Sequence, residues 1–253
     1  MSRIIAIANQ KGGVGKTTTA INLSASLAEL GKRVLIIDMD PQGNATSGLG
    51  YDKNEIENTV YELLLGEASV KQCTMKTSID NLWLIPSNVN LAGAEIELLS
   101  INNKEFVLKN ETDYIRDDFD YILIDCPPSL NMLTINAMTT AETVLVPIQC
   151  EYYALEGLSS LMPTINLVQN RLNPDLDIEG IVFTMFDART NLSQDVVDNV
   201  KNNFDKYVFE TIIPRNIRLA EAPSHGQPIN IYDPKSAGAE SYKELAKELV
   251  KKG

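Results

Sequence analysis

Short apolar runs alternate along the chain with longer segments in which apolar residues recur at helical spacing. Several runs are apolar throughout, which is typical of strands that are buried on both faces. We expect strands at residues 4–8, 34–37, 82–85, 121–124, 143–146, 178–185 and 208–213. We expect helices near residues 17–30, 104–117, 130–139, 154–172 and 192–204. This alternation predicts an α/β fold in which helices cover both faces of a mostly parallel, twisted sheet.

The length of the chain, 253 residues, suits one large α/β domain. Proline and glycine are scattered as turn residues, and neither an internal repeat nor a low-complexity linker marks a boundary. We therefore expect a single domain over residues 1–253. Residues 51–80 are the least regular part of the pattern, and we expect them to form a surface excursion.

Composition narrows the possible functions. The chain has 22 Lys and Arg against 34 Asp and Glu, a net charge of −12, so any contact with nucleic acid must be a local patch. The three cysteines lie far apart, which argues against structural zinc and a disulfide scaffold and suits a reducing cytosol. No segment approaches the run of about 18–20 apolar residues that crosses a bilayer. The expected location is the cytoplasm.

Residues 9–18 carry the strongest chemical signal, Asn-Gln-Lys-Gly-Gly-Val-Gly-Lys-Thr-Thr. They follow the first predicted strand and open a helix, which is the context of a phosphate-binding loop. Its glycines let backbone N–H groups turn toward an anion at the helix N-terminus. We expect Lys16 to reach the β- and γ-phosphates and the Thr17 hydroxyl to hold Mg²⁺. Gln10 replaces the usual first glycine, and Lys11 adds a second lysine.

Carboxylates follow two of the predicted strands. Asp38 and Asp40 come directly after residues 34–37, and Asp125 follows residues 121–124. The carboxyl ends of parallel strands meet at one edge of the sheet, so these acids should converge on the phosphates and the metal. Taken singly, each acid is also compatible with a helix N-cap or a turn.

Together these residues resemble the ParA/MinD family of deviant Walker-type P-loop ATPases, and within it the ParA/Soj partition branch. The similarity covers nearly the whole chain. The segments that carry it are residues 11–18, 38–44, 125–129, 149–158, 213–216 and 221–226.

This resemblance implies a cytoplasmic, nucleoid-associated ATPase that uses ATP and Mg²⁺ to segregate a chromosome or plasmid. It implies an ATP-dependent sandwich homodimer, non-specific binding of double-stranded DNA, and slow hydrolysis stimulated by a ParB-like centromere-binding partner. The phosphate loop then consists of Lys11, Gly12, Gly13, Val14, Gly15, Lys16, Thr17 and Thr18.

Individual roles also follow from the resemblance. Lys11 matches the signature lysine that reaches the other subunit's nucleotide, and Lys16 and Asp40 complete the catalytic set, with Asp40 positioning the attacking water. Asp38, Asp125 and Thr17 match the residues that organise Mg²⁺ and its waters. Pro214 and Asn216 match a segment near the adenine.

Two arginines, Arg189 and Arg218, match positions that contact DNA phosphates in the family. From charge alone, a solvated surface or intramolecular pairing explains them as well. The phosphate loop starts by residue 9, so we expect no N-terminal DNA-binding extension.

Three alternatives remain open. A MinD-like membrane ATPase needs a C-terminal amphipathic helix that inserts into lipid. The apolar stripe in residues 242–250 is more typical of a helix face docked on its own domain, so a membrane partner is not expected. An electron-transfer reductase needs two cysteines per subunit to bridge a cluster, and Cys126 instead suits a small core residue. A scaffold without hydrolysis is the third, and partner-stimulated phosphate release would exclude it.

Overall fold

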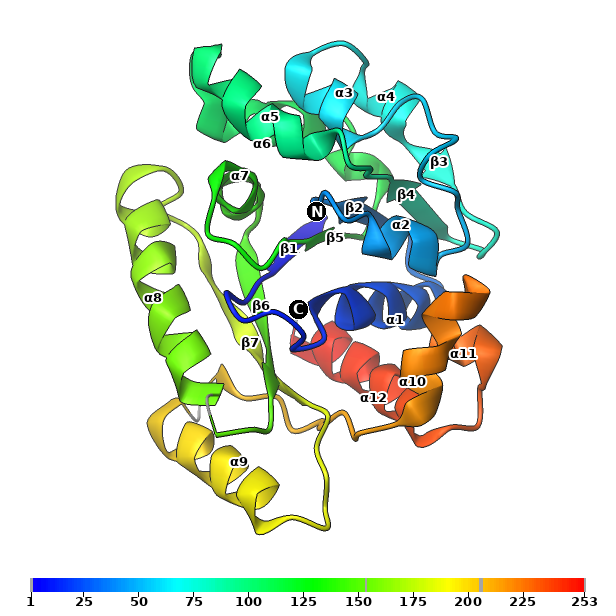
Figure 1. Cartoon of the computed structure of the whole chain (residues 1–253), viewed down its shortest axis with the longest axis vertical. Coiled ribbons are helices and arrows are strands. Elements are labelled where there is room, and N and C mark those ends of the chain that lie inside the picture. The colour runs from blue at the N-terminus through cyan, green and yellow to red at the C-terminus, as the bar shows by residue number, and fades with distance from the viewer. Residues whose placement is uncertain (1, 153, 205–206, 253) are drawn as a thin grey trace.

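One sheet of seven strands forms the centre of the part of the chain that the computed structural model describes, residues 2–152, 154–204 and 207–252 (Figure 1). The strand order is β3-β4-β2-β5-β1-β6-β7, and every pairing except β3 with β4 is parallel. The strands are β1 (Arg3–Ile7), β2 (Val34–Asp38), β3 (Met75–Lys76), β4 (Leu82–Ile85), β5 (Tyr121–Asp125), β6 (Thr143–Gln149) and β7 (Asp177–Thr184). The predicted α/β class and the mostly parallel sheet are confirmed.

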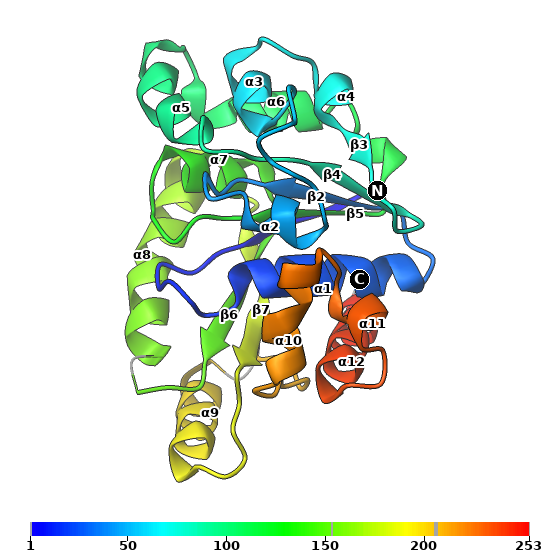
Figure 2. The ribbon, with the colours of Figure 1, turned by 45° about the vertical axis from the view of Figure 1, so that its right-hand side comes forward.

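Helices cover both faces of this sheet (Figure 2). On one side lie the phosphate-loop helix and the C-terminal segments: α1 (Lys16–Glu29), α2 (Asn44–Gly48), α10 (Ile217–Glu221), α11 (Ile229–Tyr232) and α12 (Ala237–Lys252). On the other side lie α3 (Val60–Leu65), α4 (Val70–Cys73), α5 (Leu91–Glu97), α6 (Val107–Thr112), α7 (Met132–Thr140), α8 (Ala154–Arg171) and α9 (Asn191–Phe204). Short 3₁₀ segments occupy Leu98–Ser100, Lys104–Phe106, Arg116–Asp118 and Ala222–His225.

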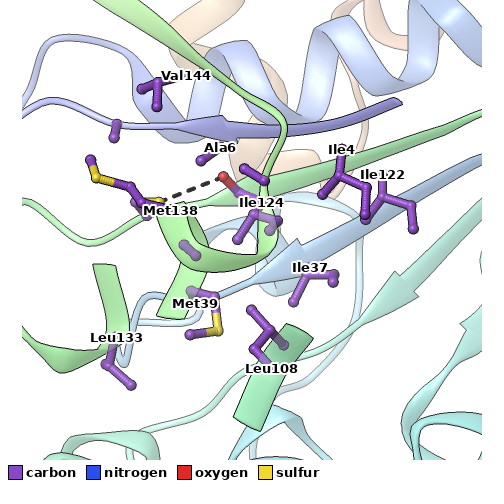
Figure 3. Packing of buried hydrophobic residues seen from close by; sticks show 14 of the residues in the cluster. Ile4, Ala6, Ile37, Met39, Leu108, Ile122, Ile124, Leu133, Met138 and Val144 are labelled. Atoms are coloured by element: carbon purple, nitrogen blue, oxygen red, sulfur yellow. Dashed lines mark hydrogen bonds between the residues drawn. The ribbon is translucent and has the colours of Figure 1, made fainter. Parts of the chain in front are cut away.

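The two helical layers explain why the strands are apolar throughout. In β1, Ile4 packs into one core cluster and the next residue, Ile5, packs into the other. Successive side chains of a strand point to opposite faces, so a strand covered on both sides has no polar position. Figure 3 shows part of the first cluster, to which Ile4, Ile37 and Ile122 of the sheet and Leu108 and Met138 of the helices belong.

The segment expected to be a seventh strand, residues 208–213, does not form a continuous ladder with β7. It meets β7 at an isolated bridge between Ile181 and Val208, and the Phe209 and Ile213 N–H groups donate to the Ile181 and Phe183 carbonyl oxygens at 2.9 and 2.8 Å. The ladder is interrupted because the backbone N–H groups of Glu210 and Thr211 donate to the Glu248 carboxylate, at 2.8 and 3.0 Å. The prediction of a regular strand here is wrong. The segment nevertheless covers the outer edge of β7.

Two other local expectations also need correction. Residues 104–117 do not form one α-helix: a 3₁₀ turn, Lys104–Phe106, leads directly into α6, which ends at Thr112. Residues 51–80 are no mere surface excursion: they form α3, α4 and β3, and Leu63, Leu64 and Val70 are buried in the core.

The C-terminal helix α12 docks on its own domain, as its apolar stripe predicts. Tyr242, Leu245 and Leu249 are buried, and the Tyr242 hydroxyl lies 3.1 Å from that of Thr19 on α1. Among the described residues, no helix has the length and apolarity that a membrane crossing requires.

Candidate nucleotide-binding site

The phosphate loop joins the end of β1, at the centre of the sheet, to α1, which begins at Lys16 (Figure 1). Gly13 and Gly15 have φ values of +74° and +88°, in the left-handed region that other residues adopt at a cost. A Cβ atom built on Gly12 would meet nothing within 4 Å. The loop therefore needs glycine at positions 13 and 15 for its backbone, whereas Gly12 faces open space.

Hydrogen bonds to two other strands, β6 and β7, fix this loop. The Asn9 side chain donates to the carbonyl oxygen of Pro147 on β6 at 2.8 Å and accepts from the Lys11 N–H at 3.0 Å. The Thr184 hydroxyl at the end of β7 donates to the Val14 carbonyl oxygen at 2.8 Å. Thr184 is not among the site residues predicted from the sequence, although its place near the carboxyl end of a predicted strand is a usable signal.

Lys16 lies beneath the loop. Its side chain is buried, with the residue only 7 % exposed, and Nζ donates to the Lys11 carbonyl oxygen at 3.2 Å. Burial lowers the pKa of this amine, and the negative charge of Asp125 opposes the shift. An ammonium group at a glycine-rich loop that leads into a helix is an arrangement that binds phosphates.

Lys11, by contrast, lies on the rim of the site. Its Nζ is 3.6 Å from a carboxylate oxygen of Glu151, and both side chains are partly exposed. Such an exposed pair contributes at most about 1 kcal/mol, so a stronger anion can displace it. Glu151 follows β6, and no local sequence pattern predicted this pairing.

The strand-end carboxylates converge as predicted, since Asp38 on β2 is paired in register with Asp125 on β5. Asp125 is fully buried, and neither of its carboxylate oxygens has a hydrogen-bond partner of normal geometry. The Thr17 side chain lies near enough to lower the pKa of Asp125 against the larger effect of burial. Burial, and then the charge of Asp38, raise the pKa of Asp125 well above its ordinary value. Burying a carboxylate without a partner is costly, so this group fits a site completed by a cation and its waters.

Asp38 and Asp40 are held more tightly. Asp38 accepts hydrogen bonds from the N–H and hydroxyl of Thr46, at 2.9 and 2.8 Å, and from the Asp40 N–H at 3.2 Å. Burial nevertheless raises the pKa of Asp38 to about 6. One oxygen of Asp40 accepts from the Gln42 N–H at 2.9 Å.

Within the described ranges, no group of three or more His, Cys, Asp or Glu side chains could hold a metal alone. Mg²⁺ usually keeps several waters and is bound by one or two carboxylates together with substrate phosphates, and Asp38 and Asp125 supply two neighbouring carboxylates. Thr17, Asp38 and Asp125 fit that mode of binding.

A cavity of about 560 Å³ opens beside Gly15 and Thr18. Pro214 and Asn216 line it, as does Thr184. The Asn216 side chain also caps α10 by accepting from the Arg218 N–H at 2.8 Å. The predicted adenine segment therefore lies next to the phosphate loop, across the end of β7.

The two candidate DNA-contacting arginines are paired within the chain. Arg189, whose side chain is 86 % exposed, lies 2.7 Å from Asp187 and holds the pKa of that carboxyl well below its usual range. Arg218 lies 2.9 Å from Glu221 and 3.5 Å from Asp233. The intramolecular pairing considered as an alternative thus exists, and exposed pairs of this kind contribute at most about 1 kcal/mol.

The cysteines do not suit a cluster or a redox site. Cys73, Cys126 and Cys150 are all buried. Burial raises the pKa of the Cys73 thiol to about 11 and that of the Cys150 thiol to about 12, and it raises the pKa of Cys126 further. Tyr153, which belongs to the segment 149–158 that carries the resemblance, lies outside the described residues.

The central loop, the buried lysine and the strand-end carboxylates define a P-loop nucleotide-binding domain, and a family model described as "AAA domain" matches residues 2–178. The chain is 56 % identical over 253 residues to the sporulation initiation inhibitor protein Soj of Bacillus subtilis, covering 100 % of both chains. It is 54 % identical over 252 residues to the chromosome partitioning protein ParA of Myxococcus xanthus, covering 100 % of this chain and 89 % of that one. The chain belongs to the ParA/Soj family of partition ATPases.

A solved structure titled cobyrinic acid a,c-diamide synthase from Mycobacterium smegmatis, with bound ADP and magnesium, has the same fold. Its TM-score is 0.88 at 40 % sequence identity, over 99 % of this chain and 95 % of that one.

Proposed function

We propose that this chain is an ATP-driven DNA-partition switch. Binding of ATP with Mg²⁺ closes two copies into a sandwich dimer, the dimer binds double-stranded DNA without sequence preference, and slow hydrolysis stimulated by a ParB-like partner releases it. The observation that carries this proposal is the pair of lysines on one loop, Lys16 buried beneath it and Lys11 on its exposed rim.

In this scheme the nucleotide lies along the phosphate loop. The N–H groups of residues 12–18 and the Lys16 ammonium group bind the phosphates, and the adenine occupies the cavity lined by Pro214 and Asn216. Mg²⁺, held through Thr17, Asp38 and Asp125, neutralises charge on the phosphates. The ADP and magnesium in the solved M. smegmatis relative support this cofactor assignment.

Hydrolysis requires a positioned water and compensation of negative charge more than covalent chemistry. Asp40 positions the water, while one subunit alone offers Lys16 but no second cation for the transferring phosphoryl group. In comparable switches a cation from a partner accelerates hydrolysis by about 10³–10⁵-fold, or about 4–7 kcal/mol. Lys11 supplies part of this across the dimer after exchanging its weak ion pair with Glu151, so dimerisation and hydrolysis are coupled.

DNA binding follows from the same assembly. A chain of net charge −12 can bind DNA only through a local patch, and we assign Arg189 and Arg218 to it. Each phosphate neutralised adds about 0.9 to the slope of log affinity against log salt concentration. Two or three contacts from a monomer are too weak at physiological salt, whereas a dimer doubles them, so ATP switches DNA binding through assembly.

The test compares wild type with Lys16→Ala and Asp40→Ala by size-exclusion chromatography with ATP, ADP or no nucleotide. Lys16→Ala should lose nucleotide binding, because the buried ammonium group has no substitute, whereas Asp40→Ala should bind ATP, dimerise and stall. An Asp40→Ala protein that stays monomeric with ATP would contradict the scheme.

The same proteins, with Arg189→Ala and Arg218→Ala, are then titrated with two unrelated DNA duplexes across a salt series. Binding should require ATP, ignore the sequence, and weaken by a similar factor on both duplexes in the arginine variants. Tight binding to one duplex without ATP would refute the DNA-binding step.

A further inference from the structure

Two fully buried hydroxyl groups, those of Thr46 on α2 and Ser87 after β4, lie behind the carboxylate segment of residues 38–40. The Thr46 hydroxyl donates to Asp38 at 2.8 Å and accepts from the Ser87 N–H at 2.9 Å. The Ser87 hydroxyl donates to the Asp40 carbonyl oxygen at 2.8 Å. These bonds connect the side chain of one carboxylate residue to the backbone of the other through a third segment of the chain.

The direction of each hydrogen bond in this network is fixed. The Ser87 N–H can only donate, so the Thr46 hydroxyl oxygen accepts from it and the Thr46 O–H donates to Asp38. The Asp40 carbonyl oxygen can only accept, so the Ser87 hydroxyl donates to it. A buried network in which every group is satisfied permits one arrangement and holds its members rigidly.

The backbone is shaped to allow this contact. Gly43, which precedes α2, has φ +60°, and a Cβ atom there would lie 2.7 Å from the Ser87 carbonyl oxygen. Only glycine lets the start of α2 approach Ser87 so closely. The approach brings Thr46 and Ser87 within hydrogen-bond distance although they are 41 residues apart in sequence.

We propose that Thr46 and Ser87 are positioning residues for ATP hydrolysis, which hold Asp38 and Asp40 in the geometry that the attacking water requires. This inference rests on the proposed function, in which Asp40 positions that water. The four hydrogen bonds from Thr46 and Ser87 end on Asp38, Asp40 and one another, and none reaches the phosphate loop. Losing either hydroxyl should therefore slow hydrolysis and leave ATP affinity nearly unchanged.

The experiment uses the full chain with Thr46→Val and Ser87→Ala, each of which removes one hydroxyl, and Thr46→Ser, which retains it. The matched control is Thr140→Val. The buried Thr140 hydroxyl donates to the Asn136 carbonyl oxygen at 2.7 Å, at the end of α7 and away from the candidate site. Thermal unfolding, the Kd for a fluorescent ATP analogue, and single-turnover ATP hydrolysis with Mg²⁺ are measured for each protein.

We expect Thr46→Val and Ser87→Ala to hydrolyse ATP about 10- to 100-fold more slowly, with a Kd within about twofold of wild type. Thr46→Ser should recover most of the rate, and Thr140→Val should lose stability without losing rate. An equal loss of ATP affinity and rate, or a Thr46→Ser protein as slow as Thr46→Val, would overturn the proposal. If Thr46→Val does not fold, Ser87→Ala decides, because it leaves the bonds between Thr46 and Asp38 intact.

Asp40→Ala is measured in the same series to separate the two proposals. If Asp40→Ala hydrolyses ATP at the wild-type rate, the proposed function fails. If Asp40→Ala is inactive while Ser87→Ala and Thr46→Val retain full rate, only the positioning role fails.

Discussion

Gly12 and Gly13 offer a direct test of the sandwich dimer, because they are adjacent and differ in one structural respect. A Cβ atom at either position meets nothing within 4 Å in the single chain. Gly13 has φ +74°, whereas Gly12 lies outside the left-handed region. The substitutions Gly12→Val and Gly13→Val therefore add the same side chain to the same loop, one without backbone strain and one with it.

The expected magnitudes follow from this difference. A non-glycine residue in the left-handed region costs about 1–2 kcal/mol, so Gly13→Val should weaken ATP binding about 5- to 30-fold. Gly12→Val should bind ATP normally, because its side chain points into open space. In a closed dimer that space is filled by the other subunit, and overpacking costs about 1–3 kcal/mol, which raises the dimer Kd about 5- to 150-fold.

The assay combines titration with a fluorescent ATP analogue and light scattering after size exclusion in ATP, over a range of protein concentrations. The dimer interpretation requires Gly12→Val to bind ATP like wild type yet remain monomeric at concentrations where wild type dimerises. Equal dimerisation of Gly12→Val and wild type would show that the loop does not face a second copy.

Two further predictions concern groups around the loop. Thr184→Val removes the 2.8 Å hydrogen bond to the Val14 carbonyl oxygen and leaves that buried oxygen unpaired. The free energy of unfolding, measured in urea, should fall by about 1–3 kcal/mol, and an unchanged value would contradict the anchoring role. Burial raises the pKa of Cys150 to about 12, so roughly one molecule in 10⁴ carries the thiolate at pH 8. Iodoacetamide reacts with the thiolate and should therefore label the cysteines rapidly only in urea. Fast labelling of the native protein would show that these thiols are accessible.

The strands on both sides of the phosphate loop could be predicted from sequence because burial on two faces demands continuous apolar runs. The two-residue strand β3 could not, since Met75 and Lys76 carry no such run and their pairing depends on β4. The strand expected at residues 208–213 failed for a related reason: Glu248, almost 40 residues away, takes over the backbone N–H groups that a ladder would use.

Some residues of the candidate site could likewise be predicted from the sequence, and others could not. The phosphate loop and the three aspartates were predictable because each sits at a strand end, and parallel strands bring their carboxyl ends together. Glu151, Thr46 and Ser87 could not be predicted, because their partners are set by tertiary packing. A serine or threonine has no sequence signature that distinguishes a buried donor from an exposed one.

A short segment of the chain covers each of the two edges of the sheet. The antiparallel strand β3 covers β4, and the bridging segment around Val208 and Pro214 covers β7, with the Phe209 N–H donating to the Ile181 carbonyl oxygen at 2.9 Å. An open strand border is a template for pairing with another molecule, and here neither border presents a long row of free amides within the described chain. Short, covered borders of this kind disfavour the joining of two copies into one continuous sheet. If two copies assemble as the proposed function requires, we expect them to meet through the phosphate loop, where Gly12 faces open space, so that the contact depends on the nucleotide bound there.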